Sequence, residues 1–202
     1  MANSAKEHDF VAFSDFENYL PSYDAPASFV ATPIYEGDTK LGVLILQMPI
    51  EVINSIMTND GQWVQAGLGE TGETYLVGPD HKMRSVSRFF IEDPEGYFEL
   101  LRKLGYSEQL IQGMQLKKTS IGLQTVNTTA TVNAFKGQTG FGQINDYRGV
   151  RVLSAFEPIR VQGLDWAILC EIDAAEAFQP IKDLQFKIIS YILEFLIMSF
   201  FK

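Results

Sequence analysis

The segment at residues 67–88 places the tightest constraint on how this chain can fold. Its glycine-rich start leads into residues 73–77, whose β-branched and aromatic side chains favour a strand. Residues 78–81, Gly-Pro-Asp-His, then have the composition of a turn, and residues 82–86 are predicted to return as a second strand. The segment therefore predicts a β-hairpin that opens a sheet.

The glycines of this segment also match a nucleotide-binding pattern, Gly67-x-Gly69-x-x-Gly72. That pattern binds a dinucleotide when it follows a strand and opens a helix, because the amides at the start of the helix then face the pyrophosphate. Here the glycines follow a polar loop and precede a strand. We therefore predict no nucleotide site at this loop.

Composition limits the possible partners. The 202 residues are 46% hydrophobic and 12% aromatic, which is enough for a core in one large domain or one and a half smaller ones. The net charge of −9 argues against nucleic acid and anionic lipid surfaces. Cys170 is the only cysteine, so an intramolecular disulfide is excluded, and its apolar surroundings predict a buried side chain.

Two predicted units share the order strand, turn, strand, helix. In the first, residues 29–35 and 41–48 are predicted strands, and a helix is predicted from Pro49. Residues 41–48 are apolar at successive positions, which predicts burial on both faces. The same order returns about 124 residues later and suggests two related modules.

Between these units, two helices are predicted at residues 93–104 and 107–116. Residues 125–135 fit either a strand or a short helix. Residues 140–147 and 150–159 are predicted strands, joined by a turn at Arg148-Gly149.

The last predicted strand alternates strictly and is predicted to bury one face. The alternating residues are Leu164, Trp166, Ile168, Cys170 and Ile172. Asp173 is predicted to cap the following helix, with Glu176 completing a capping box. Residues 188–201 are mostly apolar, but 14 helical residues span only about 21 Å of a hydrocarbon core of about 30 Å. They form either an apolar terminal helix or, as we expect, the start of a transmembrane helix.

Catalytic chemistry is sparse in this sequence. The two histidines, His8 and His81, have no metal-ligand spacing with other residues, and no nucleophile elbow or phosphate-cradling lysine loop is present. Asp146 and Asp165 are better explained by turn and strand-end solvation than by catalysis. We predict no enzyme activity, cofactor or metal.

Binding chemistry is better represented near the hairpin and residues 140–147. The candidate ligand-binding residues are Tyr75, Arg84, Ser85, Arg88, Asp146 and Tyr147, with Ser87 and Arg148 beside them. If the helices at 93–116 fold over the sheet, they would enclose a small cavity with convergent polar groups. An arginine there would favour a carboxylate or phosphate on the ligand. Alternatively, Arg84 and Arg88 form structural ion pairs.

Two blocks of the sequence resemble the double Cache sensor domains of bacterial transmembrane receptors. The first block is FVATPI at 29–34, LGVL at 41–44 and GLGETGETYLVG at 67–78. The second is DYRG at 146–149 and VL at 152–153, followed by WAIL at 166–169, EID at 171–173, EAF at 176–178 and PI at 180–181. The resemblance covers roughly residues 10–185. Over this range the sequence is similar to the sensor domains of chemoreceptors, histidine kinases and adenylate or guanylate cyclases.

The resemblance implies a mixed α/β (α+β) fold, with PAS-like Cache modules built on a central antiparallel sheet flanked by helices. Residues 1–57 would be the C-terminal part of a membrane-distal module, residues 62–181 a membrane-proximal module, and residues 182–202 the start of a transmembrane helix. Residues 1–181 would lie in the periplasm or outside the cell, at the inner or plasma membrane, and the full receptor would be a homodimer.

The implied function is extracytoplasmic sensing of a small molecule, relayed through the helix at 173–202. The alternatives are a soluble α/β enzyme or ligand carrier, and a structural spacer of a receptor. The sequence departs from the family because the opening of the distal module is missing, and the distal pocket is commonly the ligand site. The aromatic and arginine signature of amino-acid-binding members is also missing, so the ligand class stays open.

Overall fold

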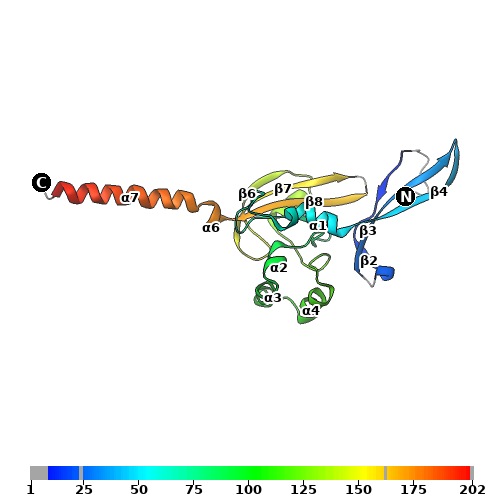
Figure 1. Ribbon diagram of the computed structural model, residues 1–202, viewed down its shortest axis with the longest axis horizontal. Helices are drawn as coiled ribbons and strands as arrows, with labels where there is room; N and C mark the ends of the chain where they lie inside the picture. The colour runs from blue at the N-terminus through cyan, green and yellow to red at the C-terminus, as the bar shows by residue number, and fades with distance from the viewer. Residues whose placement is uncertain (1–8, 23–24, 162, 201–202) are drawn as a thin grey trace.

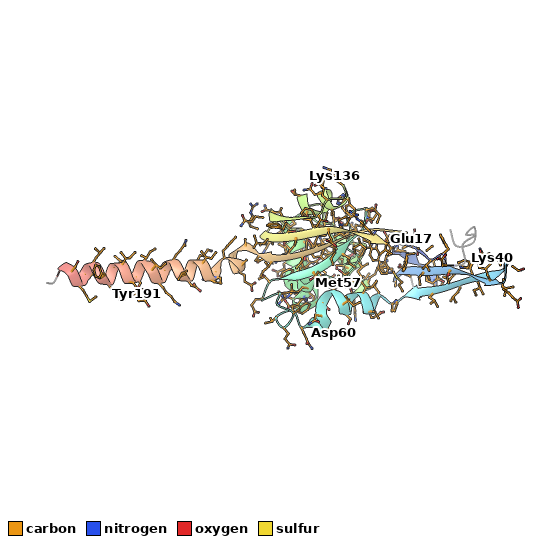
Figure 2. The ribbon with its side chains drawn as sticks, turned by 90° about the horizontal axis from the view of Figure 1, so that it is seen from above. Glu17, Lys40, Met57, Asp60, Lys136 and Tyr191 are labelled. Atoms are coloured by element: carbon orange, nitrogen blue, oxygen red, sulfur yellow. The ribbon has the colours of Figure 1, made fainter. Side chains whose placement is uncertain are left out.

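The computed structural model describes residues 9–22, 25–161 and 163–200. The molecule is elongated, with a β-hairpin at one end, an α/β module in the middle and a long helix at the other end (Figure 1). Lys40, near the tip of the hairpin, and Tyr191, on the long helix, lie on opposite sides of the middle module (Figure 2).

The first sheet is built around one long strand. Its strands are β1 (Ala12–Phe13), β2 (Glu17–Tyr19), β3 (Ala25–Glu36) and β4 (Thr39–Met48), and a short 3₁₀ helix, η1 (Leu20–Ser22), follows β2. All three other strands pair with β3 in antiparallel register. The strands predicted at residues 29–35 and 41–48 are therefore confirmed and pair as a hairpin, and helix α1 (Ile50–Thr58) begins directly after Pro49 as predicted.

The prediction that residues 41–48 are buried on both faces is wrong. Leu41 is 61% exposed and Ile45 is 60% exposed. The physical reason is the position of the hairpin, which projects away from the middle module (Figure 1). Apolar side chains on both faces of a strand are buried only if another sheet or helix packs on each face. The sequence of the strand alone does not show whether such a layer is present.

The middle module has a second antiparallel sheet, in the order β5-β8-β7-β6. The strands are β5 (Glu73–Val77), β6 (Gly140–Asn145), β7 (Arg151–Val161) and β8 (Leu164–Asp173). The helices are η2 (Asn59–Gly61), α2 (Arg88–Glu92), α3 (Pro94–Lys103), α4 (Glu108–Lys117) and α5 (Thr129–Ala134). Helices α2 to α4 lie together on one side of the sheet, and α1 packs against β5 (Figure 1). The structure confirms a mixed α+β fold with a central antiparallel sheet flanked by helices.

The second strand predicted at residues 82–86 does not form. Only isolated bridges occur there, from Met83 to Val77 and from Lys82 to Thr125. The Ser85 hydroxyl accepts a hydrogen bond from the amide of Leu76 at 3.0 Å, so a side chain replaces one rung of the expected ladder. The ambiguous segment at 125–135 contains the short helix α5, whose start is capped by Thr128.

Strand β8 turns the opposite face toward the core from the one predicted. Ala167 and Leu169 are fully buried, whereas Cys170 is exposed. Leu169 is directly opposite Tyr75 in the β5–β8 pair, so both face the layer that α2 to α4 cover. Trp166 is buried on the other face because it stacks on Phe16, with ring centroids 5.6 Å apart.

After β8 the chain continues into α6 (Ala174–Ala177) and α7 (Gln179–Phe200). The predicted capping box is wrong, because Asp173 is the N-cap residue but its side chain makes no capping hydrogen bond. Helix α7 points away from the module, and its side chains at 179–199 are exposed. Over the described residues, no helix combines the length and apolarity that a membrane crossing requires. A membrane role for α7 stays a prediction.

Candidate functional site

A cluster of buried polar side chains lies between the second sheet and the helices. The Tyr147 hydroxyl donates to Glu73 Oε1 at 2.6 Å, and it also shares a 2.7 Å hydrogen bond with the Ser87 hydroxyl. The Tyr75 hydroxyl donates to Glu171 Oε2 at 2.8 Å. The rings of Tyr75 and Tyr147 meet edge to face, with centroids 5.7 Å apart. Burial raises the pKa of both tyrosines well above its usual range, so both remain hydrogen-bond donors.

A cavity of about 250 Å³ opens beside this cluster, between helices α2 and α3 and the turn after β6. Its lining residues are Phe89, Glu92, Asp93, Gly96, Tyr97, Leu100, Arg148 and Val150. The guanidinium of Arg148 lies over the Phe89 ring, 3.7 Å from its centroid. The cavity thus presents one cation, two carboxylates and an aromatic surface, which is a mixture suited to a small polar ligand.

Arg148 connects this cavity to the exit from the sheet. Its Nε donates to Asp146 Oδ2 and its Nη2 donates to Asp173 Oδ1, both at 2.6 Å. Asp146 also accepts the amides of Arg148 and Val150, which fixes the turn. Burial raises the pKa of Asp146, although its bonds with Arg148 oppose that rise. Asp173 is the N-cap residue of α6, which we call the exit helix because the chain leaves the sheet through it. A residue of the cavity therefore directly contacts the start of the exit helix.

A larger hollow over the first sheet has different chemistry. Its volume is about 490 Å³, and its lining residues are Ala12, Phe13, Ser14, Tyr19, Phe29, Ala31 and Ile45. None of these side chains is charged, and convergent polar groups of the kind that orient a small ligand are not gathered there. The smaller cavity beside Arg148 is therefore the better candidate site.

The structure divides the six predicted site residues into two groups. Tyr75 and Tyr147 lie in the buried cluster, and Asp146 holds Arg148 at the cavity. Ser85 is buried, but its hydroxyl is bonded to the backbone of β5. The guanidinium groups of Arg84 and Arg88 are not at the cavity: that of Arg84 bonds Asp15, and that of Arg88 bonds the glycine-rich loop. Contact between any of the six and a ligand stays a prediction.

Arg84 joins the first sheet to the middle module. Its Nε and Nη2 donate to the two carboxylate oxygens of Asp15 at 2.7 and 2.8 Å, and Asp80 lies 3.0 Å away. Asp15 also accepts from the indole N–H of Trp166 at 2.7 Å. Burial raises the pKa of Asp15, but the bonds and charge of Arg84 outweigh that effect and lower it overall. This geometry agrees with the structural ion pair that the sequence left open for Arg84.

Arg88 braces the glycine-rich loop from within. Its Nη1 donates to the carbonyl oxygens of Gly69 and Gly72 at 3.0 and 2.7 Å. Its Nε lies 3.0 Å from the Glu92 carboxylate, and its guanidinium lies 4.8 Å from the Trp63 ring centroid. Arg88 is the first residue of α2, which lines the cavity through Phe89 and Glu92. Helix α2 therefore contacts the glycine-rich loop through Arg88 and the cavity through Phe89 and Glu92.

The amides of the same loop hold a carboxylate from the protein itself. The backbone N–H groups of Glu70 and Thr71 donate to the two oxygens of Glu176, each at 2.8 Å, and the Thr71 hydroxyl donates to the same carboxylate. A Cβ atom at Gly69 would lie 2.2 Å from Glu176 Oε1, so glycine is required for this approach. These bonds lower the pKa of Glu176. The glycine pattern thus precedes a strand, as predicted, and its anion partner comes from α6.

The sequence did not predict the roles of three glutamates near the site: Glu73 and Glu171 were not among the candidates, and Glu176 was predicted only as part of a helix cap. Glu171 shares the inward face of β8 with Ala167 and Leu169, and the face prediction for that strand was wrong. The available signal was a charged residue at the period-2 positions of an apolar strand, which is an unusual place for a carboxylate.

No protein-family model matches the sequence, and no curated protein matches it. Several solved structures are similar. The ligand-binding domain of the Pseudomonas aeruginosa PAO1 amino acid chemoreceptor PctB, in complex with L-Arg, is 15% identical with a TM-score of 0.49, covering 88% of this chain and 60% of that one. The periplasmic sensory domain of the Campylobacter jejuni chemoreceptor Tlp1 is 15% identical with a TM-score of 0.48, covering 89% and 55%.

The ligand-binding domain of the Pseudomonas fluorescens chemoreceptor CtaA, in complex with L-leucine, is 14% identical with a TM-score of 0.46, covering 88% and 58%. The chain thus spans less than two thirds of the length of each of these domains. All three are ligand-binding or sensory domains of bacterial chemoreceptors.

Proposed function

We propose that this chain is the extracytoplasmic, small-molecule-sensing segment of a bacterial transmembrane signalling receptor, and that it carries no catalysis of its own. Residues 1–57 are the end of a membrane-distal module, residues 62–181 are a membrane-proximal module outside the cytoplasm, and residues 182–202 begin a membrane helix. The full receptor is a homodimer. One observation carries the proposal: Arg148 lines the cavity and also bonds Asp173, at the start of the exit helix.

The ligand site is the cavity of about 250 Å³ beside the tyrosine cluster. The guanidinium of Arg148 is suited to a carboxylate or phosphate, because its planar donors match those groups. Glu92 and Asp93 on the other wall would accept hydrogen bonds from a cationic or hydroxyl group. We therefore propose a small ligand with one anionic group.

Two connections would carry the effect of binding to α6. The first is the direct bond from Arg148 to Asp173. The second runs from α2 through Arg88 to the glycine-rich loop, whose amides hold Glu176. A ligand shifts such an element only if it binds one arrangement better than the other, so the relay requires the Arg148 bonds to differ between the free and bound states.

A thermal-shift screen of the purified chain against small carboxylates, amino acids and phosphate esters tests the site. A true ligand at 100 times its Kd stabilises the protein by about 2.7 kcal/mol. This stabilisation is measured as a rise in Tm. We expect the rise to persist in Arg102→Ala, which removes an exposed arginine on α3, and to be lost in Arg148→Ala. Leu100→Trp, which fills the cavity without removing a charge, gives the same test if Arg148→Ala folds poorly.

The proposal is wrong about this cavity if no compound stabilises the wild-type chain. It is also wrong if a stabilising compound acts equally on Arg148→Ala and Leu100→Trp.

A further inference from the structure

Two buried glutamates lie directly opposite each other on strands β5 and β8 of the second sheet. In the β5–β8 pair, Glu73 is directly opposite Glu171, and in the β7–β8 pair Ser154 is directly opposite Glu171. Residues directly opposite in an antiparallel pair project to the same face, so all three side chains lie on the inward face. Glu73 is 2% exposed and Glu171 is 3% exposed. A carboxylate pair in this position has almost no access to water.

The hydrogen-bond donors around this pair are all neutral. Glu73 accepts from the Tyr147 hydroxyl at 2.6 Å, the Arg88 backbone amide at 3.1 Å and the Ser87 hydroxyl at 3.4 Å. Glu171 Oε2 accepts from the Tyr75 hydroxyl. Over the described residues, Glu171 Oε1 and Ser154 Oγ make no well-aligned hydrogen bond, although the neutral Ser154 hydroxyl faces Glu171 from the neighbouring strand. Ionising both carboxylates would therefore leave two buried negative charges without a direct cationic partner.

The nearby charges do not remove this cost. The groups that face the pair are Tyr147, Ser87 and the Arg88 amide on the Glu73 side, Tyr75 and Ser154 on the Glu171 side, and Tyr97, Asp146 and Arg148 at longer range. Arg148 donates to Asp146 and Asp173 and not directly to either glutamate, although its charge lowers the pKa of both to some extent. The Arg88 guanidinium is directed at the glycine-rich loop and Glu92.

Burial is the main reason that the pKa of Glu73 is raised to about 7; the Tyr147 bond and the charge of Arg148 oppose the rise, and the charge of Glu171 adds a smaller increase. Burial likewise raises the pKa of Glu171 to about 7, against the opposing effects of the Ser154 and Tyr75 hydroxyls. Both values exceed the ordinary glutamate pKa of about 4.3. A raised pKa in the folded state means that the bound proton stabilises the fold. That stability is complete below the unfolded pKa and is lost as the pH rises through about 7.

We propose that Glu73 and Glu171 form a proton-binding pair through which the middle module responds to external pH near neutrality. The pair binds one or two protons in mildly acidic surroundings. Loss of those protons places like charges on neighbouring strands β5 and β8. Because β8 continues into α6, the repulsion acts at the strand that leads to the exit helix. This site is separate from the cavity beside Arg148, and proton binding does not require a small-molecule ligand.

Thermal unfolding of the full chain between pH 5.5 and 8.5 tests this proposal. We expect the wild-type Tm to fall by several degrees between about pH 6 and pH 8, because stability follows the loss of bound protons. Glu73→Gln and Glu171→Gln, which imitate the protonated form, should each reduce that slope, and the double variant should nearly abolish it. Glu99→Gln, on an exposed glutamate of α3, should keep the wild-type slope.

The series is repeated with His8→Gln and His81→Gln together, so that the slope is also measured without imidazole side chains. The slope should persist in that background. A second measurement does not depend on variants that fold: carboxyl carbon NMR of glutamate-labelled wild-type protein should show two side chains titrating near pH 7. The proposal is overturned if all glutamate signals titrate below pH 5.5, or if the slope is unchanged in the double glutamine variant. Loss of the slope with the histidines overturns it too.

Discussion

The carboxylate of Glu176 accepts the backbone amide of Thr71 at 2.8 Å, although the two residues are 105 positions apart. We expect Glu176→Gln to weaken this contact, since an amide side chain loses the charge that strengthens these bonds. The partly exposed site suggests a loss of about 1 kcal/mol of stability. Hydrogen exchange should become faster at the amides of Glu70 and Thr71.

Gly69→Ala should disrupt the same contact through a change in the loop, because the new Cβ would clash with Glu176 Oε1. It should accelerate exchange at the same two amides, whereas Glu99→Gln should not. Unchanged exchange at Glu70 and Thr71 in both loop variants would show that the carboxylate does not hold the loop in solution.

The Asp15–Arg84 pair should make the free energy of unfolding decrease at low pH. Because the pKa of Asp15 is lowered in the folded protein, its ionised form stabilises the fold above the unfolded pKa of about 3.9, and this contribution is lost as the pH falls through the folded value. We expect Asp15→Asn to cost roughly 2 kcal/mol at pH 7. Urea unfolding at pH 7, 5 and 3 measures the difference, which should shrink at pH 3.

Asp38→Asn, in the exposed turn between β3 and β4, is the matched control and should be neutral throughout. Equal stability of Asp15→Asn and wild type at pH 7 would mean that the ion pair does not connect the first sheet to the middle module.

Two truncations of apolar side chains should have very different effects. Leu169 is fully buried, so Leu169→Ala should cost about 2–5 kcal/mol through lost contacts and a residual cavity. Ile45 is 60% exposed, and Ile45→Ala should change stability by less than about 0.5 kcal/mol. Denaturant unfolding of the two variants checks this. A large loss in Ile45→Ala would show that another surface covers the hairpin in solution.

The order of strands and helices could be read from the sequence because local signals mark their ends. Ser107 caps α4 as predicted, and α1 begins directly after Pro49. The repeated order strand, turn, strand, helix is also present, with β3, β4 and α1 in one unit and β7, β8 and α6 in the other. These features depend on residues that are close together in the sequence, so one sequence is sufficient to predict them.

Burial was harder to predict because it depends on which layers meet. Strand β8 has apolar residues on both faces, and alternation alone could not show that Leu169 rather than Cys170 faces the helices. The inward glutamates interrupt an apolar pattern, but that interruption alone does not show which strands meet. Their role follows from strand register, which brings Glu73 opposite Glu171 across 98 positions of sequence.

The exposed position of Cys170 has a practical consequence. It is the only thiol in the chain and lies near the end of β8, shortly before the residues that lead into the exit helix. A maleimide dye or nitroxide would therefore attach at one known point without any engineered cysteine. Such a probe would register movement of this strand directly, in the native protein, whenever a candidate stimulus is added.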